Sequence, residues 1–290
     1  LSATCPVVIA PDLDEDMWRH PATKNNVEKL IGYGHIFLPV ENGELASGLH
    51  GEGRMAEPET IIAFLENFLS PAVPQPLAGK KALVTAGPTY EPIDPVRFIG
   101  NYSSGKMGMA VAEALAEQGA SVTLLFGPSS LDTHLANIEV KRSHTAVEMY
   151  DACLQHFPGA DITVMAAAVA DYRPKKTALQ KIKKQDKEIM TLELEQTQDI
   201  LQALGDQQND HQVLVGFSLE TENETHFALQ KMQRKNVDLM VPNSLWDDGA
   251  GFQHDTNKIT IFDKSGKEQS FPLQSKKTAA NEIVAAIIRL

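Results

Sequence analysis

Residues 81–126 have the pattern of a strand, a long loop, a helix and a second strand, and this pattern most constrains the fold. Lys81–Ala86 is an apolar run that ends at Gly87, as expected of a buried parallel strand. The helical pattern starts at Met107, and the apolar run Ser121–Phe126 follows it. The start of a helix in such a βαβ unit presents backbone N–H groups that attract phosphate. We therefore expect a nucleotide-binding unit.

The loop before this helix does not match the common phosphate-binding motifs. A P-loop requires Ser or Thr after Gly-Lys, but Met107 follows Gly105-Lys106, so the hydroxyl that would bind magnesium is missing. A dinucleotide fingerprint requires three closely spaced glycines directly after the strand, whereas Gly105 lies eighteen positions after Gly87. So long an insertion is usually functional. A decorated loop without chemistry remains the alternative.

The rest of the chain continues the alternation of strands and helices. Further strands are predicted at Asp161–Ala168, Gln212–Phe217 and Val237–Pro242. Four helices are predicted between and after these strands, at Ala146–His156, Asp199–Leu204, Glu222–Lys235 and Lys276–Leu290. A β-hairpin is predicted from Lys258–Phe262 and Gln269–Phe271. We therefore expect an α/β fold, namely a Rossmann-like, mostly parallel sheet flanked by helices with a C-terminal β-hairpin. Ligands of such sheets bind beyond the carboxyl ends of the strands.

Composition and proline content divide the chain and exclude some partners. Residues 70–79 contain three prolines, so we expect a linker between a unit at 1–69 and a larger one at 80–290.

The net charge of −12 argues against nucleic acid and anionic membranes as partners, and no apolar run approaches 18 residues. Cys5 and Cys153 have no disulfide or metal-ligand pattern, which fits a reducing, cytoplasmic compartment. Because the chain starts at Leu1 in what reads as the middle of a domain, we expect it to be incomplete at its N-terminus.

A cationic stretch follows the strand predicted at 161–168. It places six basic residues within twelve positions of an otherwise acidic protein: Arg173, Lys175, Lys176, Lys181, Lys183 and Lys184. Lysines at the end of a strand can offset the charges of a nucleoside triphosphate and the charge that develops during transfer. Most lysine runs are solvated loops, so this pattern alone leaves both interpretations open.

Residues 85–97, TAGPTYEPIDPVR, and 101–108, NYSSGKMG, together resemble the signature of the bifunctional coenzyme A biosynthesis flavoproteins. The segments 167–172, AAVADY, and 181–184, KIKK, resemble the CTP-binding motifs of the same family. The resemblance spans the whole chain, with a complete ligase part and only the C-terminal segment of the decarboxylase part. It implies CTP-dependent joining of 4′-phosphopantothenate to cysteine through an acyl-cytidylate, with phosphopantothenoylcysteine, CMP and pyrophosphate as products.

The resemblance also implies roles for individual residues. Catalysis would fall to Asn101, Lys181 and Arg97. Nucleotide binding would fall to Gly87, Ser103, Ser104, Gly105, Ala167, Ala168, Asp171, Lys181, Thr197, Asp199, Ile200, Phe217, Lys231 and Lys235. The family implies Mg²⁺, held mainly by the triphosphate, and CTP as co-substrate. It also implies a homodimer through the ligase part, with a higher oligomer open for the full-length protein.

The first 69 residues resemble the C-terminal part of the family's flavin-dependent decarboxylase domain, through Asp14, Met17, Ser47, Arg54 and Met55. Asp14 stands where the family has an asparagine that binds the substrate carboxylate, and a carboxylate there is repulsive. Ser47 stands where the family has a cysteine that donates a proton, and a serine hydroxyl is a much weaker acid. FMN belongs to the complete decarboxylase domain, so we do not expect decarboxylation by this chain alone.

Two other functions compete with a CTP-dependent ligase. A Rossmann-type NAD(P) oxidoreductase would use the glycine-rich helix start, but the sequence has no acidic residue clearly placed for a ribose hydroxyl and no Tyr-x-x-x-Lys pair. A non-catalytic nucleotide-binding subunit would explain the departures at Asp14 and Ser47, whereas the presence of Arg97, Asn101 and Lys181 argues against it. The sequence also leaves open ATP in place of CTP.

Overall fold

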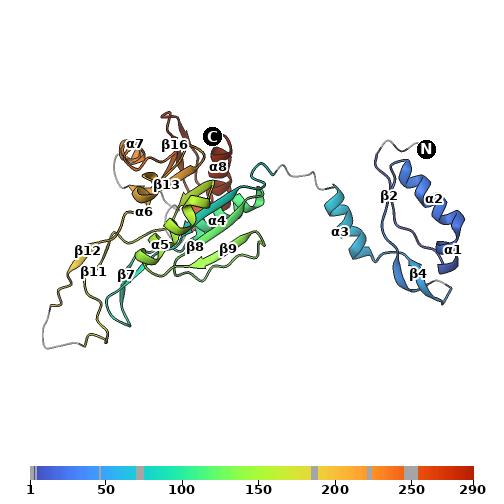
Figure 1. Ribbon diagram of the computed structural model, residues 1–290, viewed down its shortest axis with the longest axis horizontal. Helices are drawn as coiled ribbons and strands as arrows, with labels where there is room; N and C mark the ends of the chain where they lie inside the picture. Colours follow the sequence, from blue (N-terminus) through green and yellow to red (C-terminus); the bar gives the residue numbers. More distant parts are fainter. Residues whose placement is uncertain are drawn as a thin grey trace. The chain divides into compact units, whose positions relative to one another are not determined.

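The computed structural model describes residues 3, 5–45, 47–69, 75–183, 189–220, 224–244 and 254–290. The chain forms two compact units, Leu1–Val73 and Pro74–Leu290 (Figure 1). Residues 70–74 of the expected linker, together with Lys184 and Glu222, lie outside the described residues. Leu77, also expected in the linker, is buried in the core of the larger unit, and its N–H donates to the Gln118 carbonyl at 3.0 Å. The larger unit therefore includes part of the segment that we expected to be linker.

The smaller unit consists of short elements. Two parallel strands, β1 (Val8–Ile9) and β2 (Ile36–Phe37), are joined through helices α1 (Glu15–Arg19) and α2 (Pro21–Gly32). An antiparallel hairpin of β3 (Glu41–Glu44) and β4 (His50–Arg54) follows, and helix α3 (Pro58–Leu69) ends the unit.

The larger unit is built on one sheet, which has eight strands within the described residues, in the order β17-β16-β14-β13-β10-β5-β8-β9 (Figure 1). The six strands from β9 to β14 are parallel, and the C-terminal hairpin of β16 and β17 adds two antiparallel strands. Their bounds are β5 Lys81–Ala86, β8 Ser121–Phe126, β9 Ile138–Arg142, β10 Ile162–Met165, β13 Val213–Glu220, β14 Leu239–Ser244, β16 Thr260–Asp263 and β17 Glu268–Ser270. This is the mostly parallel α/β fold that the sequence predicts.

Helices cover both faces of this sheet, and the alternation along β5 shows why the strand is apolar throughout. Ala82, Val84 and Ala86 pack in a cluster with helices α4 (Lys106–Glu117) and α8 (Lys276–Ile288). Leu83 packs on the opposite face in a second cluster, with the helices α5 (Ala146–His156), α6 (Ile200–Gly205) and α7 (Glu224–Lys235) and the turn η1 (Phe157–Gly159). Because β5 is buried on both faces, its sequence reads as one hydrophobic run.

The order of the strands reverses between β5 and β10. From β5 the chain passes through α4 to β8 and then to β9, and α5 brings it back to β10 on the other side of β5. Neighbouring loops therefore leave the carboxyl ends of β5 and β10 in opposite directions. In open α/β sheets ligands bind at this switch point.

Several small elements were not predicted. Within the described residues of the larger unit, three two-stranded ladders lie outside the main sheet: β6 (Tyr90–Pro92) with β7 (Phe98–Gly100), β11 (Tyr172–Pro174) with β12 (Leu194–Gln196), and β15 (Thr256–Asn257) with β18 (Gln274–Ser275). The strand expected at 161–168 ends at Met165. Beyond it the Ala167 N–H donates to Thr85 Oγ1 at 3.2 Å and the Ala168 N–H to the Gly87 carbonyl at 2.9 Å, so a loop over the end of β5 replaces the ladder.

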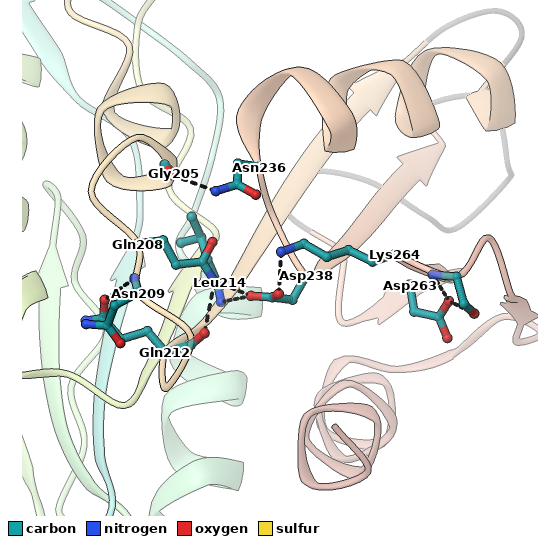
Figure 2. Close-up of polar contacts among 10 residues, drawn as sticks. Gly205, Gln208, Asn209, Gln212, Leu214, Asn236, Asp238, Asp263 and Lys264 are labelled. Atoms are coloured by element: carbon teal, nitrogen blue, oxygen red, sulfur yellow. Dashed lines mark hydrogen bonds and ion pairs between the residues drawn. The ribbon is translucent and has the colours of Figure 1, made fainter.

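A polar cluster fixes the amino ends of β13 and β14 (Figure 2). Asp238 Oδ2 accepts from the Leu214 N–H at 2.7 Å and from Gln208 Nε2 at 2.5 Å, and Asp238 Oδ1 pairs with Lys264 Nζ at 2.8 Å. Asn236 Nδ2 donates to the Gly205 carbonyl at 2.9 Å and ties α7 to the end of α6. This cluster lies at the edge of the sheet opposite to the carboxyl ends of the parallel strands.

Candidate functional site

The start of helix α4 lies against the carboxyl end of β5 because glycines allow the approach. A Cβ on Gly105 would meet Phe126 Cε2 at 2.5 Å and Gly87 Cα at 3.2 Å, and both glycines have φ above +80°. A Cβ on Gly108 would overlap the Ala86 side chain. Gly105 caps the helix without a side-chain hydrogen bond. The first turn of α4 therefore faces the switch point with its backbone N–H groups, as expected of a phosphate site.

The loop after β10 forms the other side of the switch point. Its turns are fixed by hydroxyl groups: Thr89 Oγ1 accepts from the Ala170 N–H at 3.0 Å, and Thr197 Oγ1 donates to the Ala170 carbonyl at 2.6 Å. Asn101 Nδ2 donates to the Ala168 and Val169 carbonyls at 3.0 and 3.3 Å. Asn101 thus connects the loop before α4 to the loop after β10.

A cavity of about 810 Å³ opens between these loops. Thirteen of the predicted site residues line it: Asn101, Ser103, Ser104, Gly105, Ala167, Ala168, Asp171, Thr197, Asp199, Ile200, Phe217, Lys231 and Lys235. Gly87, Arg97 and Lys181 do not line it. Eight polar lining residues were not among the predicted site residues: Lys106, Tyr172, Gln196, Gln198, Ser218, Arg234, Asn257 and Lys276. Lys106 stands within the predicted motif and Arg234 next to Lys235, so these two could have been found from the sequence.

One wall of the cavity is formed by α6 and α7. Asp199 begins α6, where its Oδ1 accepts from the Gln202 N–H at 3.0 Å, and its other oxygen pairs with Lys235 Nζ. Burial would raise the pKa of Asp199. The hydrogen bonds from Lys235 and the Gln202 N–H, with the charges of Lys235 and Lys231, outweigh burial and lower this pKa. Lys231 and Lys235, one helical turn apart, both line the cavity as predicted. Lys235 is buried against Asp199, so this wall is an organised charge pair and not a solvated helix face.

Cations from α4 and α8 line another wall. Lys106 Nζ pairs with Asp255 Oδ1 at 2.5 Å, and the buried Lys276 donates to the His254 carbonyl. Burial and the nearby Lys106 lower the pKa of Lys276. Two basic side chains therefore border the cavity on the side of the α4 start, where a further anionic group can be accommodated.

Arg97 and Lys181 belong to an arm, which we define as residues 90–100, with β6 and β7, and residues 172–183 and 189–196, with β11 and β12. The arm projects from the body of the larger unit (Figure 1). Asp94 is buried in the turn between β6 and β7 and accepts from the N–H groups of Val96 at 2.8 Å, Arg97 at 2.9 Å and Ile182 at 3.1 Å. Arg97 Nη2 donates to Asp94 Oδ2 at 2.5 Å and to the Ile182 carbonyl at 2.6 Å. Arg97 is thus held next to Lys181, outside the cavity.

The electrostatics of Asp94 follow from these contacts. Burial alone would raise its pKa, but the N–H groups of Val96 and Ile182 and the Arg97 side chain outweigh it and lower the pKa to about 2. Asp94 is therefore ionised at neutral pH. It was part of the sequence signature but was not among the predicted site residues, and it holds Arg97 and the Ile182 N–H next to Lys181.

The smaller unit brings together the two residues that depart from the family pattern. Ser47 Oγ donates to Asp14 Oδ1 at 2.6 Å, and Arg54 pairs with Glu57. Met17 and Met55 are exposed. The Ser47 hydroxyl is already satisfied by Asp14, and no buried polar side chain without a partner lies among the described residues of this unit. These residues alone therefore do not form a site that fits FMN.

Three further findings bound the chemistry of the described residues. None of their His, Cys, Asp and Glu side chains form a group of three or more that could hold a metal ion. None of their helices is long and apolar enough to cross a membrane. Cys5 is exposed, and Cys153 is a buried free thiol whose pKa is raised to about 12 by burial, so it is no nucleophile at neutral pH.

Comparisons with known proteins agree with this architecture. Residues 77–290 match the family model described as the DNA/pantothenate metabolism flavoprotein C-terminal domain, and residues 1–70 match the model described as flavoprotein. A relative from an unknown prokaryotic organism, named cysteine/cysteine sulfinic acid decarboxylase, is 48% identical over all of this chain and 81% of its own length. The coenzyme A biosynthesis bifunctional protein CoaBC of Bacillus subtilis is 44% identical over all of this chain and 71% of its own length.

Solved structures agree as well. The crystal structure of the C-terminal domain of a coenzyme A biosynthesis bifunctional protein CoaBC matches with 39% identity and a TM-score of 0.63, over 74% of this chain and 97% of that domain. The glycine-tight α4 start, the cavity at the switch point and these matches lead to one conclusion: the chain belongs to the family of the coenzyme A biosynthesis bifunctional proteins, with a DNA/pantothenate metabolism flavoprotein C-terminal domain at residues 77–290.

Proposed function

We propose that the larger unit joins 4′-phosphopantothenate to cysteine at the expense of CTP, which is a step of coenzyme A biosynthesis. The observation that supports this most is the cavity at the switch point, where the α4 start meets the basic side chains of α7. A triphosphate needs such a combination of backbone N–H groups and lysines. The CoaBC relatives point to the same reaction through their names.

The reaction needs an activated carboxylate, because oxide is a very poor leaving group. The carboxylate of 4′-phosphopantothenate attacks the α-phosphorus of CTP, a P–O bond forms, and pyrophosphate leaves. The cysteine amine then attacks the acyl carbon, the new amide forms, CMP leaves, and the amine proton passes to solvent. We assign Lys181 mainly to the first step and Asn101 mainly to the second, with Arg97 on the carboxylate or phosphate of 4′-phosphopantothenate.

Lys181 and Arg97 lie outside the cavity lining, so the substrate has to extend from the cavity to the arm. An extended substrate with one anionic group at each end suits this separation. Thr177 Oγ1 donates to the Pro92 carbonyl at 3.1 Å and the Ala178 N–H to the Ile93 carbonyl at 3.0 Å, so the segment that carries Lys181 is tied to the end of β6. We place the activating step at the border between the cavity and the arm.

Magnesium fits this site as a companion of the triphosphate. The described residues offer no cluster of three metal ligands, but Asp171 lines the cavity and can add one carboxylate to the phosphate oxygens. When bound, the ion would offset the charge of the triphosphate.

The test is pyrophosphate release by the purified chain with 4′-phosphopantothenate, cysteine, magnesium and either CTP or ATP. Release with CTP that requires 4′-phosphopantothenate supports the ligase. Release with ATP but not with CTP keeps the ligase and shows that its nucleotide is ATP. A chain that releases no pyrophosphate but binds CTP is a nucleotide-binding subunit. A chain that binds NADPH and not CTP is an oxidoreductase.

We also propose that the larger unit forms a homodimer and works in the cytoplasm on small-molecule substrates, with no nucleic acid or membrane partner. The arm supports the dimer, because its side chains Val96, Phe98, Leu179, Ile189 and Leu194 are exposed and apolar. A second copy would present the same side chains and could cover them symmetrically.

A second candidate function concerns the protein to which the smaller unit belongs. Asp14 and Ser47 contact each other at 2.6 Å, and Asp14 adds a negative charge where the family binds a substrate carboxylate with a neutral amide. That charge repels an N-acylated cysteine but attracts the ammonium group of a free amino acid. The relative named cysteine/cysteine sulfinic acid decarboxylase favours such a substrate. Release of CO₂ by the full-length protein from cysteine, compared with phosphopantothenoylcysteine, tests this proposal.

A further inference from the structure

Ser218 is a buried hydroxyl that lines the cavity and has no hydrogen-bond partner among the described residues. It lies near the carboxyl end of β13, opposite Pro242 of β14, and is 4% exposed. A Cβ on Gly216, two residues earlier, would point at Leu201 of α6 and Met240 of β14. Because side chains alternate along a strand, Ser218 faces the same side of the sheet, which α6 and α7 cover.

An unpartnered buried hydroxyl costs folding free energy, so its position calls for a physical explanation. Within the described part of the chain, three other buried polar atoms share this state, on Thr163, Gln208 and Gln274. None of those three residues lines the cavity. Ser218 is therefore the one whose missing partner can be supplied by a molecule in the cavity.

The charges on this wall define the partner. Lys231, Arg234 and Lys235 line the same cavity from α7, and their side chains can only donate hydrogen bonds. The carboxylate of Asp199 is already engaged by Lys235 and by the Gln202 N–H. An incoming acceptor oxygen would satisfy the Ser218 hydroxyl and the α7 cations together.

We infer that Ser218 Oγ donates a hydrogen bond to an acceptor oxygen of the bound nucleotide, and so contributes to nucleotide affinity. This inference rests on the proposed function. The acceptor is a phosphate oxygen or the carbonyl oxygen of the pyrimidine base, since both offer the same hydrogen-bonding chemistry.

The experiment measures binding of CTP, CMP, cytidine and pyrophosphate to the full chain by calorimetry, for the wild type, Ser218→Ala and Thr163→Val. Ser218→Ala should bind CTP about 10-fold more weakly, because the hydrogen bond from the hydroxyl to the nucleotide is lost. Its stability to urea should equal or exceed that of the wild type, because the hydroxyl has no partner in the free protein. Thr163→Val removes a buried hydroxyl without a partner at 1% exposure outside the cavity, and should leave CTP affinity unchanged.

The smaller ligands identify the acceptor. A loss of affinity that persists with pyrophosphate assigns Ser218 to the phosphates, and a loss that persists with cytidine assigns it to the base. Equal CTP affinity of Ser218→Ala and the wild type overturns the inference and leaves the proposed function intact. A variant that loses stability and affinity together also overturns it, since the role is then structural. Absence of CTP binding by the wild type overturns the proposed function and, with it, the role of Ser218.

Discussion

At the scale of single residues, Asn101 and Lys181 sit in different surroundings, which predicts different effects on the two steps. Asn101→Asp would put a carboxylate oxygen against the Ala168 or Val169 carbonyl, to which the amide now donates. We expect the second step to slow by roughly 100-fold and the acyl-cytidylate to accumulate. Lys181→Gln should reduce pyrophosphate release by a similar factor. Quenched-flow sampling of CTP, intermediate and pyrophosphate measures both.

Lys183→Gln is the matched control for the second variant, because Lys183 is an exposed lysine of the same cationic segment but is not among the residues assigned individually to catalysis or nucleotide binding. Its pyrophosphate release should stay near that of the wild type. Rapid, complete turnover by Asn101→Asp, or unchanged release by Lys181→Gln, contradicts the assigned roles.

The second prediction at this scale concerns Asp94 and pH. The pKa of Asp94 is lowered from 3.8 to about 2, so its ionised form stabilises the β6–β7 turn and its contact with Ile182 fully above pH 4. That contribution is lost as the pH falls from about 4 through about 2, and it does not change between pH 5 and 8. The protection factors of the Val96, Arg97 and Ile182 amides, which compare their hydrogen exchange with the intrinsic rate at the same pH, should therefore fall in acid and, at neutral pH, in Asp94→Ala.

The matched control is Asp132→Ala, an exposed carboxylate outside the arm whose side chain accepts from the Thr133 N–H. It should leave the exchange of the three arm amides unchanged. Slow exchange at these amides in Asp94→Ala would mean that other contacts hold the arm.

At the scale of secondary-structure elements, Asp238 joins four segments at the amino edge of the sheet (Figure 2). Asp238 directly precedes β14. Its carboxylate accepts hydrogen bonds from the Leu214 N–H and from Gln208 and pairs with Lys264. Asp238→Ala leaves the Leu214 N–H and Gln208 without their acceptor, which should cost about 2–3 kcal/mol of unfolding free energy. CTP affinity should not change, because the cavity lies at the opposite edge.

Urea unfolding of Asp238→Ala measures the expected loss of stability, and calorimetry of the same variant measures its CTP affinity. Lys264→Ala is the control, since it removes only a half-exposed ion pair and should cost at most about 1 kcal/mol. A large fall in CTP affinity in Asp238→Ala would show that the two edges of the sheet are coupled.

Elements also explain which parts of the fold could be predicted. The strands β5, β8, β10, β13 and β14 are buried on both faces, so their runs of apolar residues were visible in the sequence. The strand β9 was missed because it lies at the edge of the sheet and three of its five residues, Glu139, Lys141 and Arg142, are charged. The ladders of the arm were missed because they have three residues per strand and are held by tertiary contacts such as the stacking of Tyr90 on Phe98.

The residues of the site also divide into those that the sequence could predict and those that it could not. Residues in a continuous motif, such as Ser103 to Gly105, could be assigned from the sequence because the motif and the helix start coincide. Ser218, Asn257 and Lys276 come to the cavity only through the packing of distant elements, so no local pattern identified them. The separation of Lys181 and Arg97 from the cavity likewise depends on the course of the arm.

At the scale of the whole molecule, the arm leads to a prediction about assembly. Leu179 is 94% exposed, and Phe98 and Val96 are more than half exposed on the neighbouring ladder. Short two-stranded ladders are marginal in water and need a covering partner. A symmetric dimer uses each side chain twice, so Leu179→Glu should weaken the dimer by about 100-fold or more. Sedimentation velocity over a range of protein concentrations measures the change.

Leu273→Glu provides the control, because Leu273 is also exposed and apolar but lies near the C-terminal hairpin, outside the arm. It should leave the dimer intact. Ligase activity should fall with the dimer in Leu179→Glu and recover at protein concentrations that restore it, because the arm carries Lys181 and Arg97. A wild-type chain that stays monomeric at tens of micromolar contradicts the dimer, and a monomeric but fully active variant shows that the arm works without a second copy.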